Sequence, residues 1–209
     1  ERISFVGWST GTPRAGGYAV LHPERVERLV MFGPAPYFEA EAPPAQYPEH
    51  GAPMILQSRN FLLHNRWQDH VHCEGQLEDP AVCDAVWREL MEVDTVGATW
   101  GRDGRGIMRA PNRMNFGWKS NLAKIKAPTL MMIGDYDSYA KRVEAWRGLG
   151  APQRMFVKVA CATHFMQFER GRHLLYRATA EWLERGSVDG HAEGEYHADA
   201  AGRLAPGKS

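Results

Sequence analysis

Residues 3–35, ISFVGWSTGTPRAGGYAVLHPERVERLVMFGPA, decide the fold of this chain. An apolar stretch at 3–6 predicts a short strand, and residues 7–11 follow at once with the pattern G-x-S-x-G. A serine on a sharp strand-to-helix turn is held in strained backbone geometry, and small residues two before and two after it keep Cβ atoms out of the turn. Ser9 is therefore a candidate nucleophile whose hydroxyl projects beyond the edge of a sheet.

The residues after this motif supply the context that it needs. Four apolar residues between 15 and 21 have the spacing of one helix face. Residues 25–32, RVERLVMF, then form an apolar run typical of a buried parallel strand, which Gly33 ends. Strand, turn, helix and strand follow one another in the order that the motif requires.

This stretch resembles the central strand, nucleophile turn, following helix and next strand of the α/β-hydrolase family. Thr12 and Pro13 stand where many relatives continue with another glycine, but proline is tolerated in the first turn of a helix. The resemblance extends over about residues 3–185. It implies an α/β fold with a mostly parallel sheet, helices on both faces and an inserted helical cap, and it implies a serine hydrolase of the esterase type.

The resemblance divides the chain into four parts. Residues 1–36 hold the nucleophile strand, the turn, the helix and the next strand, and residues 122–185 hold the remainder of the core with the acid and the histidine. Residues 37–121 are too long for a bare loop and are expected to form a cap, with helical segments around 54–63 and 80–93. The polar, glycine-rich tail at 186–209 is expected to be an appendage with little core of its own.

A serine nucleophile needs a base to take its proton and a carboxylate to orient that base. Residues 127–137, APTLMMIGDYD, predict a strand that ends at Gly134 and is followed by two aspartates. The family order of serine, acid and histidine is filled by Ser9, Asp137 and His164, which follows the last predicted strand at 155–159. Asp135 is the alternative acid. Some relatives take the acid from the end of the preceding strand, where Glu39 and Glu41 are the less favoured candidates.

The oxyanion hole of the family uses two backbone N–H groups. Thr10, the residue after the nucleophile, supplies one of them by this resemblance. The second belongs to a loop that the family places ahead of the nucleophile strand, whereas this sequence opens with Glu1. We therefore expect an N-terminal segment or a companion chain to complete the fold, and a poor catalyst in its absence.

Aromatic side chains are the candidates for lining a pocket for an apolar or aromatic small-molecule ester: Trp8, Trp87, Trp100 and Phe116. Most aromatic residues of a cap simply hold it together. Ester hydrolysis through an acyl-enzyme is the first hypothesis. Acyl transfer, amide hydrolysis and C–C bond hydrolysis use the same triad, and a non-catalytic hydrolase-like binding protein is an alternative of another class.

The composition narrows the classes of partner. Equal numbers of basic and acidic residues, 25 of each, give a formal net charge of zero, which offers no electrostatic footprint for nucleic acid or an anionic membrane. No apolar run approaches the ~20 residues that span a bilayer. The oligomeric state and the compartment stay open, with the cytoplasm slightly favoured.

Neither a metal nor another cofactor is expected. His70, His72 and Cys73 lack the paired spacing of structural zinc ligands, and the histidines of the tail lack the His-Glu-x-x-His pattern. Three cysteines are too few for a disulfide framework, although a bridge between Cys73 and Cys83 is open to an exported chain.

Overall fold

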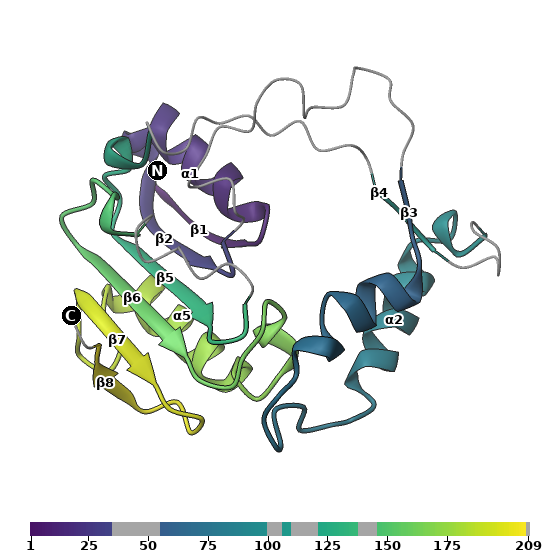
Figure 1. The fold of residues 1–209 in the computed structure, drawn as a ribbon. Helices are drawn as coiled ribbons and strands as arrows, with labels where there is room; N and C mark the ends of the chain where they lie inside the picture. The colour runs from purple at the N-terminus through teal and green to yellow at the C-terminus, as the bar shows by residue number, and fades with distance from the viewer. Residues whose placement is uncertain (35–54, 100–105, 110–120, 138–145, 208–209) are drawn as a thin grey trace. The chain divides into compact units, whose positions relative to one another are not determined.

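The computed structural model describes residues 1–34, 55–99, 106–109, 121–137 and 146–207. The chain forms two compact units, one made of Glu1–Glu41 with Asn115–Ser209 and the other of Ala42–Met114. In the first unit the ribbon forms a twisted sheet between helices, and in the second it forms helical turns beside a short strand pair (Figure 1).

The first unit is built on a six-stranded sheet with the order β1-β2-β5-β6-β7-β8. Its strands are β1 (Ile3–Trp8), β2 (Val26–Phe32), β5 (Thr129–Gly134), β6 (Arg154–Val159), β7 (Gly194–Ala198) and β8 (Leu204–Pro206). All neighbours are parallel except β7 and β8, which are antiparallel. The predicted α/β class with a mostly parallel sheet is thereby confirmed.

Helices cover both faces of this sheet. Because side chains alternate along each strand, neighbouring residues of one strand contact helices on opposite faces. Leu29 and Met31 of β2 face α1 (Gly11–Leu21), whereas the intervening Val30 faces α5 (Arg172–Arg185). Every residue of the central strand β5 is buried, as expected for a parallel strand with both faces covered. The strands predicted at 25–32, 127–134 and 155–159 form within one or two residues of those bounds.

The C-terminal tail differs from the expected appendage. After α5, Gly186 adopts a left-handed φ of +71° that turns the chain back toward the sheet. Strand β7 then pairs in parallel with β6, and β8 pairs with β7. Val188 and Ala198 are 0% and 2% exposed within the core. A polar composition conceals this role because a sheet accepts a new strand through backbone hydrogen bonds, which do not depend on apolar side chains.

The second unit contains one regular α-helix within its described residues, α2 (Val82–Val93), in agreement with the helical segment expected at 80–93. Strand β3 (Ile55–Gln57) pairs antiparallel with β4 (Ile107–Arg109). The helical segment expected around 54–63 is therefore wrong at its start, because helical structure begins only at residue 59 and continues through the turn Phe61–Asn65. A three-residue strand is too short for a period of two to stand out from a helical spacing.

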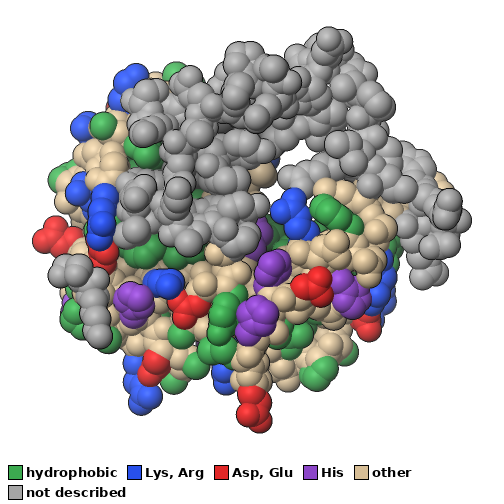
Figure 2. Space-filling model, in the orientation of Figure 1, with side chains coloured by type: hydrophobic (Ala, Val, Ile, Leu, Met, Phe, Trp, Pro, Cys, Tyr) green, Lys and Arg blue, Asp and Glu red, His purple; other side chains and the backbone are tan. Residues whose placement is uncertain are grey.

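The described surface carries charges of both signs. On the face shown in Figure 2, Lys and Arg side chains are interspersed with Asp and Glu rather than gathered into a region of one sign, as a net charge of zero predicts. Within the described residues, none of the helices has the length and apolar character that crossing a bilayer requires.

Candidate active site

Ser9 lies directly after β1, in the sharp turn that leads into α1. Its φ of +51° is in the left-handed region that side chains other than glycine rarely adopt. Its N–H donates to Phe32 O at 3.2 Å, and its carbonyl accepts hydrogen bonds from the N–H of Thr12 at 3.1 Å and from Thr12 Oγ1 at 2.6 Å. The surrounding structure thus holds Ser9 in a strained conformation.

The two glycines of the G-x-S-x-G motif have different surroundings. A Cβ on Gly7 would lie 2.9 Å from Gly11 O and 3.0 Å from Thr12 Cα, so the turn has no room for it. A Cβ on Gly11 would meet no described atom within 4 Å. The expected crowding is therefore present at the first glycine and not, within the described residues, at the second.

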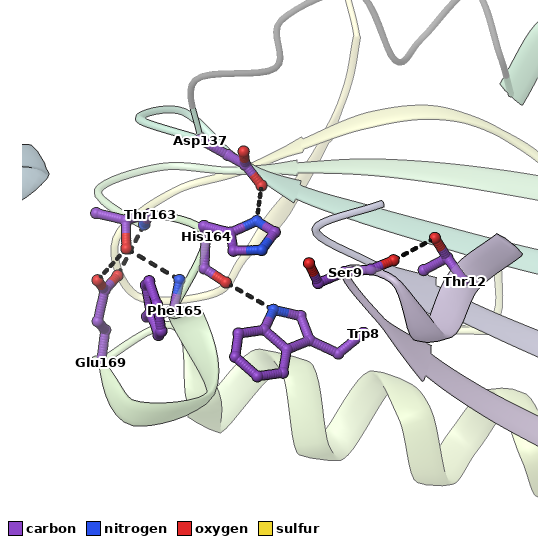
Figure 3. A network of polar contacts seen from close by, with 8 residues as sticks. All are labelled: Trp8, Ser9, Thr12, Asp137, Thr163, His164, Phe165 and Glu169. Carbon is purple, nitrogen blue, oxygen red and sulfur yellow. Dashed lines mark hydrogen bonds and ion pairs between the residues drawn. The ribbon is translucent and has the colours of Figure 1, made fainter. Parts of the chain in front are cut away.

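Asp137 and His164 lie together beyond the carboxyl ends of β5 and β6. Asp137 Oδ2 is 3.0 Å from His164 Nδ1, and the two residues are 27 positions apart in the sequence. The Asp137 side chain is fully buried and that of His164 is 17% exposed. Asp137 Oδ1 is also buried and has no hydrogen-bond partner among the described residues. In Figure 3 the Ser9 side chain points toward the ring of His164.

The alternative acid, Asp135, has a different environment. Its carboxylate lies 3.1 Å from Lys158 Nζ, and its N–H donates to Val159 O at 2.9 Å. Both side chains line a hollow of about 280 Å³ that also borders Asp137, whereas neither Ser9 nor His164 borders it. Glu39 and Glu41 lie outside the described residues.

Gly33 is a site residue that the sequence analysis missed. It follows β2 with a φ of +47°, and a Cβ on it would lie 3.0 Å from His164 Nδ1 and 3.3 Å from Asp137 Oδ2. The Asp137–His164 pair therefore packs closely against the side of Gly33 where another residue would carry its Cβ, and an added Cβ would require the pair to shift. The sequence shows a glycine after a strand, but it does not show which side chains will pack on it.

Two further side chains contact the loop that carries His164. Trp8 Nε1 donates to His164 O at 2.9 Å. Glu169, which is 0% exposed, accepts from the N–H of Thr163 at 2.8 Å and from Thr163 Oγ1 at 2.5 Å. The sequence predicts a place for Trp8 in a substrate pocket. It does not mark Glu169, which stands beside Arg170 in the segment FMQFER.

The remaining predicted residues are placed as follows. Thr10 occupies the N-cap position of α1 without a side-chain capping hydrogen bond, at the end where the first N–H groups of a helix have no partner within the helix. Trp87 is 5% exposed and, inside the second unit, lines a hollow of about 640 Å³ with Met91 and Arg59. Trp100 and Phe116 lie outside the described residues.

The described residues contain no group of three or more His, Cys, Asp or Glu placed to hold a metal ion. Cys83 is buried and is not part of a disulfide, so the bridge with Cys73 that the sequence left open is not formed.

No model of a known protein family matches this sequence, and neither does any curated protein. Solved structures do match it. The carboxylesterase CesB (YbfK) from Bacillus subtilis is 20% identical with a TM-score of 0.56, over 90% of this chain and 61% of that one. A thermophilic esterase from Thermogutta terrifontis is 18% identical with a TM-score of 0.58, over 88% and 65%.

A monoacylglycerol lipase from Paleococcus ferrophilus is 19% identical with a TM-score of 0.51, over 88% of this chain and 68% of that one. The chain thus spans about 61–68% of the length of these three structures. Each match covers 88–90% of this chain. The chain therefore has the α/β-hydrolase fold.

Proposed function

We propose that this chain carries the catalytic triad of a carboxylic ester hydrolase, with Ser9 as nucleophile, His164 as general base and Asp137 as the orienting acid. The observation that carries the proposal is the 3.0 Å contact between Asp137 Oδ2 and His164 Nδ1, beside a serine held at a φ of +51°. Solved structures with a TM-score above 0.5 are named carboxylesterase, esterase and monoacylglycerol lipase, which supports ester chemistry.

Each residue has a defined step in this reaction. Ser9 Oγ attacks the ester carbonyl while His164 Nε2 takes the hydroxyl proton, and the same proton then passes to the departing alkoxide, which leaves as an alcohol. Water next attacks the acyl-enzyme and gives a proton to His164. His164 passes this proton to Ser9 Oγ as the bond to the acyl carbon breaks, so the carboxylic acid leaves and the Ser9 hydroxyl is restored. Asp137 stays ionised and holds Nδ1–H of His164, which keeps Nε2 directed at the serine.

The developing oxyanion needs hydrogen-bond donors in a fixed position. The N–H of Thr10, at the start of α1, is the first donor in this proposal. Among the strands that the structure describes, β1 pairs only with β2, and its Ile3 and Val6 are 43% and 51% exposed. An exposed apolar edge favours pairing with a further strand. We place the second donor on an N-terminal segment or companion chain that docks there.

The proposed substrate is an ester of apolar or aromatic character. Trp87 and Met91 give apolar surface to the hollow of the second unit, which the charged Arg59, Asp84 and Arg88 also line, and aromatic side chains are common in the walls of small-molecule sites. Acyl transfer, amide hydrolysis and C–C bond hydrolysis remain alternatives on the same triad. A panel of esters, amides and acyl acceptors separates them.

A fluorophosphonate probe tests the triad directly. We expect the probe to label Ser9, and we expect Ser9→Ala to abolish both labelling and ester turnover, because the nucleophilic oxygen is gone. Ser187→Ala removes another hydroxyl of the same unit and should leave both unchanged. Equal labelling of the wild type and Ser9→Ala would refute the assignment. A chain that binds an apolar ligand equally well with Ser9→Ala, and turns over no ester, would be a binding protein.

A further inference from the structure

The main chain at His164 is fixed by two side chains from different parts of the first unit. Trp8 reaches it from the nucleophile turn, 156 positions away, with Nε1 2.9 Å from His164 O. Glu169 holds the preceding residue, Thr163, through its N–H and its hydroxyl. The two contacts thus flank the base on both sides (Figure 3).

Trp8 adjoins Ser9 in the sequence and contacts His164 in the structure. It is the residue immediately before Ser9, and its ring lies 5.5 Å from the rings of both His164 and Phe165, tilted by 36° and edge-on at 68°. It also stacks on Phe32, at 6.3 Å and 12°. With its polar nitrogen directed at the His164 carbonyl, Trp8 couples the position of the nucleophile turn to that of the base.

The second contact is made by the buried carboxylate of Glu169, which binds Thr163. A carboxylate that is 0% exposed is costly to bury unless it is hydrogen-bonded. Here both carboxylate oxygens accept from Thr163, one from its N–H at 2.8 Å and one from its Oγ1 at 2.5 Å. Thr163 Oγ1 in turn accepts from the N–H of Phe165 at 3.0 Å. The N–H groups of Thr163 and Phe165, one residue before and one after His164, are therefore both held by one network.

We propose that Trp8 and Glu169 are positioning residues for the general base, which hold the main chain of His164 so that the imidazole meets Asp137 and Ser9 together. This inference rests on the triad proposed above. A misplacement of about 1 Å in such a group can cost about 10²-fold in rate. In this role Trp8 acts through its indole N–H, in contrast to the substrate-lining role expected from the sequence.

Trp8→Phe separates the two roles because it removes the N–H and keeps an apolar ring. If Trp8 is a positioning residue, Trp8→Phe should lower kcat about tenfold and change KM by less than about twofold. The loss in kcat should be the same for short-chain and long-chain esters. A substrate-lining role predicts a change in KM that depends on the acyl chain. Trp182→Phe is the matched control, because Trp182 is fully buried and its Nε1 finds no hydrogen-bond partner in the described chain.

Glu169 is tested by graded replacement. Glu169→Gln keeps one carbonyl oxygen that can accept from Thr163 and should retain more activity than Glu169→Ala, in the order wild type, Gln, Ala. The rate at which a fluorophosphonate labels Ser9 should follow the same order, because that attack also needs the base. A purely structural role would instead lower the unfolding temperature of each variant and leave the labelling rate of the folded protein at the wild-type value.

Two outcomes overturn the inference. One is a kcat and labelling rate for Trp8→Phe equal to those of Trp182→Phe, and the other is a Glu169→Ala protein that labels as fast as the wild type at a temperature where it is folded. Either result leaves the proposed function intact as long as Ser9→Ala abolishes labelling. Absence of labelling in the wild type would refute the proposed function itself, and this inference with it.

Discussion

Gly33 lies so close to the Asp137–His164 pair that a single added methyl group should disturb the pair. Gly33→Ala would place a Cβ 3.0 Å from His164 Nδ1 and 3.3 Å from Asp137 Oδ2, a separation at which one of them must shift. We expect the variant to lose at least tenfold in kcat/KM, because displacing either partner disturbs the orientation of the base. The measurement is ester hydrolysis or fluorophosphonate labelling alongside a thermal unfolding curve.

Gly190→Ala provides a matched control for this effect. Gly190 also has a positive φ, +80°, but a Cβ there would meet nothing within 4 Å. Both variants should lose about 1–2 kcal/mol of stability, since each forces alanine into the left-handed region. Only Gly33→Ala should lose activity. Equal activity in the two variants would show that the Asp137–His164 pair tolerates the added methyl group.

The two aspartates after β5 are separated by the same kind of assay. Asp137→Asn should lower kcat by about 10⁴, because an amide no longer holds the base in its productive tautomer. Asp135→Asn removes a partly exposed ion pair with Lys158, which is worth at most about 1 kcal/mol of stability, and should leave kcat within a few-fold of the wild type. The reverse ranking would assign the acid to Asp135.

Among the elements, the hairpin between β7 and β8 should depend on pH through Asp199. The N–H of Arg203, its guanidinium and the N–H of Ala201 all donate to this carboxylate and lower its pKa below the usual 3.8. A lowered folded-state pKa stabilises the fold above pH 3.8, and this contribution is lost as the pH falls through the folded-state value. Asp199→Asn should therefore be less stable than the wild type at pH 7, with a smaller difference at pH 3.

Thermal unfolding of both proteins at the two pH values checks this hairpin. The prediction fails if the difference in unfolding temperature is the same at pH 7 and pH 3. Arg203→Lys, which keeps the backbone donor and the positive charge, should fall between the wild type and Asp199→Asn at neutral pH.

The long elements could be read from the sequence, and the short ones could not. Strand β5 is buried at every position, and its continuous apolar run made it recognisable. Strand β3 has three residues, too few for its periodicity to differ from that of a helix, and it was assigned to one. Strands β7 and β8 carry polar and small residues because they lie at the margin of the sheet, so their pattern offered no apolar signal.

The candidate site also contains residues that the sequence predicts and residues that it does not. Ser9 is predicted from a local motif, and Asp137 and His164 from the order of serine, acid and histidine that the resemblance to the α/β-hydrolase family implies. The contact of Gly33 with the Asp137–His164 pair and the hydrogen bond from Trp8 to His164 both depend on which loops meet after folding. The sequence therefore predicts a different role for Trp8. The contact joins positions 156 apart, which no local pattern encodes.

The C-terminal tail should contribute to the stability of the first unit. Arg177 of α5 bonds to Asp189 and donates to Gly202 O at 3.2 Å, and the N–H of Asp189 donates to Glu181 at 2.8 Å. Together with the buried Val188, these contacts tie the described part of the tail, residues 187–207, into the first unit. A chain that ends at Gly186 should therefore lose more than about 2 kcal/mol of unfolding free energy, the value of burying one valine-sized side chain.

Urea unfolding of the full chain and the shortened chain measures this loss as a lower transition midpoint. The shortened chain should also self-associate in a concentration-dependent way, because the edge of β6 that pairs with β7 would be left open to strands of other copies. Val188→Ala provides a graded control that keeps both strands and should lower the midpoint without promoting association. An unchanged midpoint in the shortened chain would instead make the tail the appendage that its composition suggests.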